Sequence, residues 1–377
     1  MHYYENNPQT DLLSLALGVM TFFYGALLGV FLVGFLMRHR GNGISNSLGM
    51  GLSIIAIVLI KYNTDLAWPW FIVIGTLITF FVASLGRTTA QVIEHFDKKL
   101  QNEIKPSEFI AGGSVANSMV GLSSFGNSVY FFGKVNNDLF GKKYFESLKK
   151  ENVGFNFQQE IYKDSTGICF VFITPDGERT LSTHLGIANK LSEKEVIDKE
   201  VEQSELILIE GYLWDTPEAK NAISKSIEIA NKSSTLISLS LSDLFCVERF
   251  KKEFLDLTKN KIDLLFGNEG EFKALFENDN IEKIIKELSI LNKTFVITMG
   301  EKGAICVNKK DVFRTSSEKI NKVIDLTGAG DLFAAGFIHG FINKMGFEKS
   351  LRLGAKSAAK IIQILGARPQ EKLSNLI

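Results

Sequence analysis

The sequence predicts an α/β protein with a mainly parallel sheet flanked by helices, preceded by three apolar helices. After Arg87, short apolar runs alternate with polar-faced helical patterns, as in parallel strands joined by crossover helices. Residues 1–90 hold only 4 of the 42 Lys and Arg and 3 of the 42 Asp and Glu. Glycine-rich turns near residues 112 and 328 each precede a helical pattern. Turns of this kind, at the N-terminus of a helix, commonly bind ligands in α/β proteins.

Composition narrows the class of protein. The 377-residue chain has a formal net charge of zero, so no global field favours nucleic acid, and we expect no nucleic-acid partner. A hydrophobic content of 45% with 22% charged residues excludes a disordered, collagen-like or coiled-coil chain. The uneven charge predicts two domains, a membrane segment over residues 1–88 and an α/β domain over residues 89–377.

The N-terminal segment contains three apolar runs that suggest membrane helices. They cover residues 12–37, 44–60 and 66–85, and the first is 26 residues without a charge. A cleaved signal peptide is the alternative for the first run, but that run is too long and two more follow it. Arg38, Arg40 and Arg87 place the first loop and the C-terminal domain in the cytoplasm by the positive-inside rule. We therefore predict a multi-pass protein of the inner or plasma membrane, with lipid contact through residues 12–85.

Two stretches of this segment resemble the last helices of the sodium/solute symporter family. They are residues 15–31 and 67–76. The resemblance covers only the tail of that family, whose sodium and substrate sites lie in earlier helices. It implies common ancestry and a membrane location, and it implies little about transport.

Strand and helix patterns follow one another through the second domain. Strands are predicted at 107–111, 129–133, 168–173, 205–210, 235–240, 262–266, 294–298 and 303–307. Helices are predicted at 92–104, 140–151, 192–203, 216–231, 269–276 and 280–290. The turn residues 174–177 predict a hairpin between the β-like runs that flank them.

The segment 325–340 carries the clearest chemistry. Gly328, Ala329 and Gly330 let successive backbone N–H groups point at one spot where an apolar helix begins, which is how helix N-termini bind anions. Asp331 lies in the same turn and would repel an anion if it were merely a cap, so a catalytic use is attractive. The alternative is an ordinary N-cap Asp after a glycine turn.

A second glycine-rich element spans residues 111–117. Gly112 and Gly113 allow a ligand to approach the backbone closely, and Asn117 offers both a donor and an acceptor to a hydroxylated molecule. A simple turn from strand to helix is the alternative.

These two elements, in this order, resemble the ribokinase-type (PfkB) family of sugar and nucleoside kinases. Further matching segments are 133–141, 176–180, 268–271, 298–303 and 366–369. The resemblance covers roughly residues 91–377. It implies a ribokinase-like fold and transfer of the γ-phosphoryl group of ATP, with Mg²⁺, to a primary hydroxyl. Segments 210–215 and 241–246 look most like bacterial adenosine kinases, so the resemblance favours an adenosine-like ribosyl nucleoside, with a sugar as the alternative acceptor.

The resemblance assigns the reacting groups first. Asp331 would take the proton from the attacking hydroxyl. The N–H groups of Gly328, Ala329 and Gly330 would stabilise the transferring phosphoryl group.

On the nucleotide side, Asn268 and Glu271 resemble the pair that organises Mg²⁺ through water. A capped helix N-terminus is the alternative for that pair. Thr298, Gly300 and Gly303 match the nucleotide loop, and an ordinary turn before a strand is the alternative there.

On the acceptor side, Gly112, Gly113 and Asn117 match the positions that hold sugar hydroxyls. Asp138 belongs to a matching motif but has a structural role as its alternative. Arg179 either reaches the substrate or pairs with a neighbouring carboxylate and solvent.

The chain departs from the family before Gly112. Only 21 kinase-like residues, 91–111, precede that glycine, whereas family members begin with a central strand and a sugar-binding Asp. We therefore expect the kinase domain to lack the usual first strand. A competing hypothesis is a membrane or transport-related fusion whose kinase-like domain binds ligand without chemistry. The family also suggests a homodimer.

Overall fold

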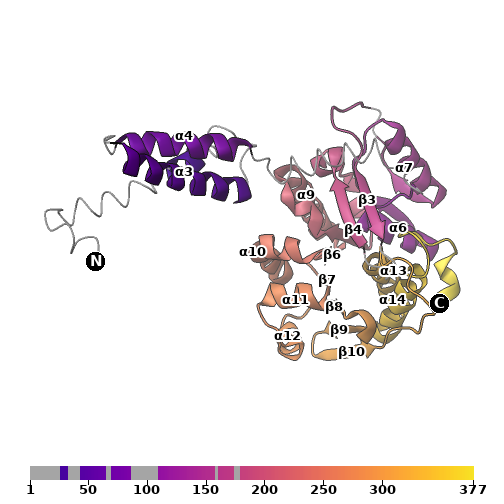
Figure 1. The fold of residues 1–377 in the computed structure, drawn as a ribbon. Helices are drawn as coiled ribbons and strands as arrows, with labels where there is room; N and C mark the ends of the chain where they lie inside the picture. Colours follow the sequence, from indigo (N-terminus) through magenta and orange to yellow (C-terminus); the bar gives the residue numbers. More distant parts are fainter. Residues whose placement is uncertain (1–25, 33–42, 65–68, 86–108, 158–159, 174–178) are drawn as a thin grey trace. The chain divides into compact units, whose positions relative to one another are not determined.

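The computed structural model describes residues 26–32, 43–64, 69–85, 109–157, 160–173 and 179–377 (Figure 1). The chain divides into two compact units, residues 1–106 and residues 107–377. The predicted domain boundary at residues 88 and 89 stays a prediction, because residues 86–108 lie outside the described part. The predicted helix at 92–104 lies outside it as well.

In the N-terminal unit, helix α3 (Gly43–Asn63) packs against helix α4 (Pro69–Leu85). A Cβ on Gly49 would lie 3.1 Å from the carbonyl oxygen of Thr79, so the glycine permits the close approach of the two helices. The Thr79 hydroxyl donates to the carbonyl of Gly49 at 3.2 Å, and the Ser53 hydroxyl donates to a carbonyl of α4 at 3.1 Å. The polar groups between these two helices are therefore paired with backbone.

The prediction of a multi-pass membrane protein is wrong. Within the residues that the structure describes, none of the helices combines the length and the apolar character needed to cross a bilayer. Helix α4 has 17 residues, which corresponds to about 26 Å against a hydrocarbon layer of about 30 Å. Helix α3 is longer, but it opens with polar residues at 45–47 and ends with Lys61 in its last turn. The predicted span 12–37 lies mostly outside the described residues, and lipid contact through residues 12–85 rested on the same spans.

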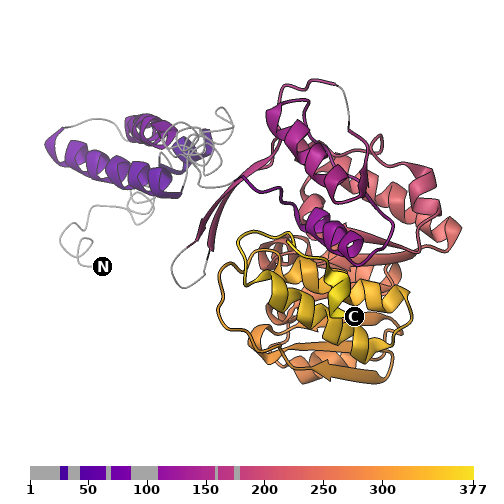
Figure 2. The same ribbon diagram turned by 90° about the vertical axis from the view of Figure 1, so that its right-hand side faces the viewer.

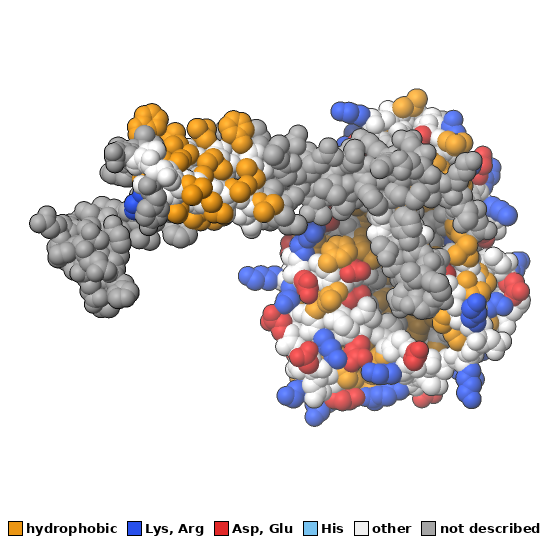
Figure 3. All heavy atoms as spheres, viewed as in Figure 1, with side chains coloured by type: hydrophobic (Ala, Val, Ile, Leu, Met, Phe, Trp, Pro, Cys, Tyr) orange, Lys and Arg blue, Asp and Glu red, His pale blue; other side chains and the backbone are white. Residues whose placement is uncertain are grey.

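Large apolar side chains lie on the exposed faces of α3 and α4. These side chains are close to half exposed or more, and they recur every three or four residues, so they form a stripe along each helix (Figure 3, orange). They are Leu48, Leu52, Ile55 and Leu59 on α3 and Trp70, Val73, Leu77 and Phe81 on α4.

The C-terminal unit is built around a six-stranded sheet with the strand order β10-β9-β8-β7-β6-β5. The strands are β5 (Leu206–Glu210), β6 (Leu236–Ser240), β7 (Leu264–Asn268), β8 (Thr294–Thr298), β9 (Ala304–Asn308) and β10 (Asp311–Thr315). Strands β5 to β8 run parallel, whereas β9 and β10 each run antiparallel to the strand before them. This arrangement confirms the predicted mainly parallel sheet.

Helices cover both faces of this sheet (Figures 1 and 2). Leu265 and Phe295 face one layer, whereas their strand neighbours Leu264 and Val296 face the other, as the period of two along a strand requires. The first layer contains α9 (Pro217–Ser233), α10 (Leu244–Asn260), α11 (Glu269–Phe276) and α12 (Ile281–Leu288). The second contains α6 (Ser114–Ser124), α13 (Ala329–Ile342) and α14 (Phe347–Ile361).

Two small sheets complete the unit. Strands β1 (Val129–Phe131) and β2 (Val153–Phe155) pair in parallel on either side of helix α7 (Leu139–Lys150). Strands β3 (Ile168–Ile173) and β4 (Arg179–His184) pair antiparallel, as the predicted hairpin requires. The hairpin turn itself lies outside the described residues, and the absence of a first strand stays a prediction.

Two predicted elements differ from the structure. Residues 109–111 are not in a strand, although 107–111 had a strand pattern. In place of the predicted helix 192–203, the structure has the shorter helix α8 (Asp198–Glu202). The Glu195 carboxylate accepts hydrogen bonds from the backbone N–H and the hydroxyl of Ser192, and these bonds fix a turn before α8. Lys134 donates to the same carboxylate at 2.7 Å, so a tertiary contact outweighs the local helical pattern.

The crossing of α13 and α14 yields a stability prediction. A Cβ on Gly336 would lie 2.6 Å from the Ser357 hydroxyl oxygen and 2.7 Å from the Leu353 carbonyl oxygen. Gly336→Ala should therefore lower the free energy of unfolding by about 1–3 kcal/mol through overpacking, measured by urea denaturation. Gly51→Ala in α3, where nothing lies within 4 Å of the added Cβ, is the control. Equal stability of the Gly336 variant and the unmodified protein would contradict the packing described.

Candidate active site

The candidate site lies where four parallel strands end. Strand β5 ends at Glu210, β6 leads into Asp243, β7 ends at Asn268 and β8 ends at Thr298. The carboxyl ends of parallel strands meet at one edge of a sheet, and open α/β sheets bind ligands outside that edge. Polar residues from four separate parts of the sequence are thereby gathered on one side.

The segment that begins α13 has the geometry of an anion-binding turn. Gly328 adopts the left-handed conformation, with φ of 80°, and a Cβ on it would lie 2.5 Å from the Cβ of Ala367. Both the backbone conformation and the close approach of the C-terminal segment therefore require glycine at this position. A Cβ on Gly330 would have nothing within 4 Å, so the N-terminus of α13 has free space beside it for an anion.

Asp331, in the first turn of α13, is contacted by side chains of α6. Ser114 donates its hydroxyl proton to Oδ1 at 2.7 Å, and the side-chain amide of Asn117 donates to Oδ2 at 2.9 Å. The Ser118 hydroxyl donates to the backbone carbonyl of Asp331 at 3.0 Å. The two glycine-rich elements singled out in the sequence thus meet at one carboxylate, although Ser114 and Asp331 are 217 residues apart.

The turn before α6 is held by α7 and by the C-terminal segment. Gly113 has φ of 99°, and the Tyr144 hydroxyl donates to the carbonyl of Gly112 at 3.1 Å. The Arg368 guanidinium lies over the Tyr144 ring, 5.5 Å from its centroid, and donates to the Ser147 hydroxyl at 2.6 Å. Burial raises the pKa of Tyr144 to about 12, so its hydroxyl keeps its proton near neutral pH and remains a donor.

Asn117 presents an unused acceptor next to Asp331. Its side chain is buried, and its Oδ1 has no hydrogen-bond partner within the described part of the chain. A buried polar atom without a partner costs about 1–3 kcal/mol. A ligand hydroxyl that donated to Oδ1 would remove this cost.

Sequence reasoning assigned no role to Glu210, which the structure places beside Asp331. The backbone N–H of Val115 donates to its Oε2 at 3.1 Å. Burial raises the pKa of Glu210 to about 7, the Val115 N–H opposes that rise, and the negative charge of Asp331 adds to it. Two sequence signals pointed to this residue: it is a glutamate at the end of an apolar strand, and it begins the segment 210–215 that resembles adenosine kinases. A carboxyl group that titrates near neutral pH therefore lies beside the candidate base.

Asn268 and Glu271 form a reciprocal cap at the start of α11. The Asn268 side chain accepts from the Glu271 N–H at 2.9 Å, and the Glu271 carboxylate accepts from the Asn268 backbone and side chain at 2.9 and 2.7 Å. Burial raises the pKa of Glu271 to about 7, against the opposing Asn268 N–H, and the charge of Asp243 adds to the rise. The helix-cap alternative from the sequence is therefore present.

The predicted nucleotide loop follows β8. Thr298 ends the strand, and Gly300 begins the short 3₁₀ helix η3 (Gly300–Lys302). A Cβ on Gly303 would lie 1.9 Å from the carbonyl oxygen of Thr315, so packing requires this glycine. Gly300 has φ of 56° and nothing within 4 Å of an added Cβ, so the backbone there is open to a ligand.

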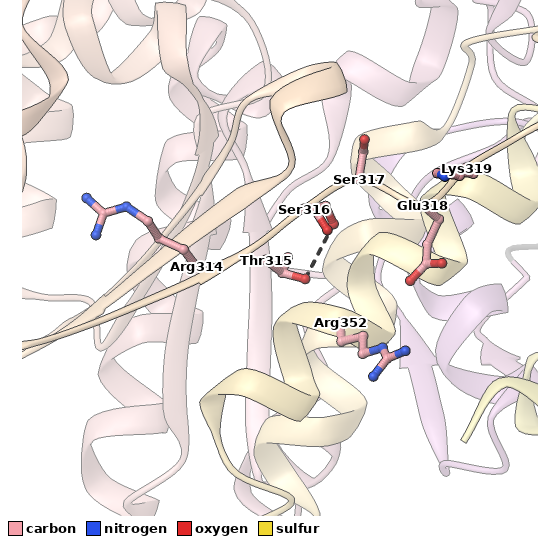
Figure 4. A pocket seen from close by; sticks show the side chains of 7 residues that line it. All are labelled: Arg314, Thr315, Ser316, Ser317, Glu318, Lys319 and Arg352. Carbon is pink, nitrogen blue, oxygen red and sulfur yellow. Dashed lines mark hydrogen bonds between the residues drawn. The ribbon is translucent and has the colours of Figure 1, made fainter.

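A cavity of about 570 Å³ lies next to this loop, because Thr315 contacts Gly303 and also lines the cavity (Figure 4). Its other lining residues are Arg314, Ser316, Ser317, Glu318, Lys319 and Arg352. The Arg314 side chain points away from the others and pairs with Glu282 at 2.9 Å. None of the candidate catalytic residues lines this cavity.

The remaining two candidates are placed differently. Asp138 caps α7, and its carboxylate accepts hydrogen bonds from the N–H of Gly141 at 2.8 Å and from the N–H and hydroxyl of Thr166 at 2.8 and 2.7 Å. Burial raises the Asp138 pKa, but these hydrogen bonds outweigh it and hold the pKa below its ordinary value. These contacts give Asp138 a structural role. Arg179 begins β4 opposite Ile173, and its side chain is outside the described part.

Comparison with known proteins identifies the family. The model of the pfkB family of carbohydrate kinases matches residues 79–373. The chain belongs to the PfkB family. This kinase therefore has a ribokinase-like fold, and its activity is that of a carbohydrate or nucleoside kinase that uses ATP.

Several relatives of this PfkB kinase are similar over most of their length. A 5-dehydro-2-deoxygluconokinase of Clostridium botulinum is 28% identical, over 75% of this chain and 87% of the relative. Adenosine kinase 1 of Arabidopsis thaliana is 27% identical, over 75% of this chain and 91% of the relative. The crystal structure of adenosine kinase from Sinorhizobium meliloti matches with a TM-score of 0.72 and 33% identity, over 75% of this chain and 86% of that one.

These matches also bear on the N-terminal segment. The PfkB match begins at residue 79, which lies inside the third run that the sequence suggested as a membrane helix. Nothing in these similarities supports the resemblance of residues 15–31 and 67–76 to symporter helices, and we do not retain it.

The buried Glu271 predicts a pH dependence of stability. Its pKa of about 7 in the folded kinase exceeds the ordinary value of 4.5, so the folded state binds more protons than the unfolded state between these pH values. Its contribution to stability is complete below pH 4.5 and is lost as the pH rises through 7. Glu271→Gln should therefore flatten the fall in unfolding free energy across this range, measured by urea denaturation at several pH values. The exposed Glu287→Gln is the matched control, and parallel curves for both variants and the unmodified kinase would refute the assignment.

Proposed function

We propose that this PfkB kinase transfers the γ-phosphoryl group of ATP to a primary hydroxyl of a ribosyl nucleoside, with adenosine as the first candidate and a sugar as the second. One observation carries the proposal. The Asp331 carboxylate lies in the first turn of α13, beside the open Gly330 position, and is contacted by Ser114 and Asn117 from the acceptor-side helix. A carboxylate, an anion-binding turn and an acceptor-side element therefore converge.

In the proposed reaction the acceptor hydroxyl oxygen attacks the γ-phosphorus. A new oxygen–phosphorus bond forms, the bond from the γ-phosphorus to the bridging oxygen breaks, and ADP leaves. Asp331 takes the hydroxyl proton. The N–H groups at Gly328, Ala329 and Gly330 stabilise the charge on the transferring group at the N-terminus of α13.

On the acceptor side, Gly112 and Gly113 give the backbone approach, and Asn117 supplies a buried acceptor for a substrate hydroxyl. Glu210 lies close enough to Asp331 for their charges to interact, so it also faces this region. Arg179 as a substrate ligand stays a prediction. Substrate contact by Asp138 stays a prediction too, although its carboxylate already accepts three hydrogen bonds.

On the nucleotide side, Thr298, Gly300 and Gly303 would bind ATP, next to the cavity behind Gly303. Asn268 and Glu271 would hold Mg²⁺ through water. The residues fit such an ion, because the buried Glu271 carboxylate faces the negative charge of Asp243 and a cation would relieve that repulsion. Among the described residues, no group of three or more His, Cys, Asp or Glu is placed to hold a metal ion by itself. When bound, Mg²⁺ would neutralise phosphate charge.

The relatives suggest two classes of acceptor. Adenosine kinases phosphorylate a nucleoside, as their names state, and the 5-dehydro-2-deoxygluconokinases phosphorylate a sugar-derived acid. The 33% identity to the Sinorhizobium adenosine kinase supports the nucleoside. The hypothesis of a domain that binds ligand without chemistry is not favoured, because the candidate base and the anion turn are both in place. A homodimer stays a prediction.

Asp331→Asn tests the proposal. The variant should lose at least about a hundredfold in kcat because the amide cannot accept the hydroxyl proton, while the KM for ATP should stay near its original value. The measurement is ADP release with adenosine, inosine, ribose, fructose and 5-dehydro-2-deoxygluconate as acceptors. Asp311→Asn, at an exposed position on β10, is the matched control. Unchanged turnover by the Asp331 variant would reject the base, and no transfer to any acceptor by the unmodified kinase would reject the function.

A further inference from the structure

The hydroxyl of Ser114 makes the contact that the acceptor must make in the proposed reaction. It donates its proton to Oδ1 of Asp331 at 2.7 Å, which is the usual length of a hydrogen bond between a hydroxyl and a carboxylate. A substrate hydroxyl that is to lose its proton to Asp331 must form this same kind of bond before the transfer. Ser114 therefore occupies the place of a substrate hydroxyl on the base.

Ser114 is also in the right position to exchange with a ligand. It is the first residue of α6 and follows Gly112 and Gly113, both of which are exposed. An acceptor that binds against these glycines would lie beside the Ser114 side chain. The second carboxylate oxygen can stay bound to Asn117 during such an exchange, because Asn117 contacts Oδ2 and not Oδ1.

Water is the nucleophile that competes with the acceptor for Asp331. In hydrolysis, a water oxygen bonds to the γ-phosphorus, the bond from that phosphorus to the bridging oxygen breaks, and Asp331 takes the water proton, giving ADP and inorganic phosphate. A water molecule can be activated in this way only if it donates a hydrogen bond to the Asp331 carboxylate, where it must compete with the donors already bound. Ser114 holds Oδ1 and Asn117 holds Oδ2.

We propose that Ser114 is a positioning residue that holds Oδ1 of Asp331 in the acceptor-free kinase, restrains transfer of the γ-phosphoryl group to water, and yields Oδ1 to the acceptor hydroxyl. This inference rests on the proposed function. It goes beyond that function because it assigns to Ser114 a control over which nucleophile reacts.

Ser114→Ala removes the hydroxyl that competes with water for Oδ1. A hydrogen bond to a charged group is strong enough that its loss should raise ADP release without acceptor by about tenfold. The number of ADP molecules released per phosphorylated acceptor should rise with it, whereas the KM for ATP should not change. Ser114→Thr keeps a hydroxyl and should retain the original ratio. A general loss of structure would lower both reactions together and would leave the ratio unchanged.

The same helix offers a matched control. Ser118 donates to the backbone carbonyl of Asp331 and not to its carboxylate, so Ser118→Ala should leave the ratio of ADP to phosphorylated acceptor unchanged. The double variant Ser114→Ala with Asp331→Asn should lose the added ADP release, because that release requires the base. If Ser114→Ala does not fold, Ser114→Cys replaces the hydroxyl by a weak donor of similar shape and should raise the ratio in the same direction.

The outcomes separate this inference from the proposed function. If the unmodified kinase phosphorylates an acceptor but Ser114→Ala or Ser114→Cys releases no extra ADP without acceptor, the inference fails and the function stands. A phosphate found on Ser114 by mass spectrometry after incubation with ATP alone would also overturn it, because the hydroxyl would then be a substrate. If the unmodified kinase phosphorylates none of the acceptors, the proposed function fails first.

Discussion

The contact between Asp331 and helix α6 is the interaction on which the candidate site depends. It joins α6 to α13. Ser114 of α6 donates to one oxygen of the Asp331 carboxylate, and Asn117 of α6 donates to the other. Both helices pack on the same face of the sheet and share one apolar cluster, so the carboxylate lies at the edge of a rigid layer. A base held in this way keeps its orientation, which phosphoryl transfer requires because it relies on positioning and electrostatics.

The C-terminal residues 366–368 link the two glycine turns, because they contact residues of both. The N–H of Gly366 donates to the buried carboxylate of Asp325, Ala367 packs against Gly328, and Arg368 lies over the tyrosine that holds Gly112. Gly366 and Ala367 therefore contact the segment that leads into α13, and Arg368 contacts the tyrosine that holds the turn before α6. Displacement of this segment would disturb both turns together, although none of its side chains is a candidate for the chemistry.

The sequence predicted the local parts of this site and missed the contacts between them. Gly328 and Asp331 lie in one turn, so spacing alone revealed an anion-binding element with a carboxylate in it. The bond from Ser114 to Asp331 spans 217 residues and depends on how two helices pack, which no local pattern encodes. Glu210 was missed because its importance comes from its position at a strand end beside another carboxylate. The membrane prediction failed because the apolar runs did not show where the helices begin and end: α4 has only 17 residues, and α3 includes polar residues at 45–47 and Lys61.

The charges around the site suit a nucleotide that arrives with a cation. Near the carboxyl ends of the parallel strands, Asp331 repels Glu210 and Asp243 repels Glu271. Burial, together with this repulsion, raises the pKa of both glutamates to about 7. Polyphosphate alone would add negative charge to this group and would be repelled. The N-terminus of α13 offsets part of that repulsion through its dipole. A divalent cation beside Glu271 would offset more of it, so the carboxylates that would disfavour free ATP are the same groups that would favour its magnesium complex in the proposed reaction.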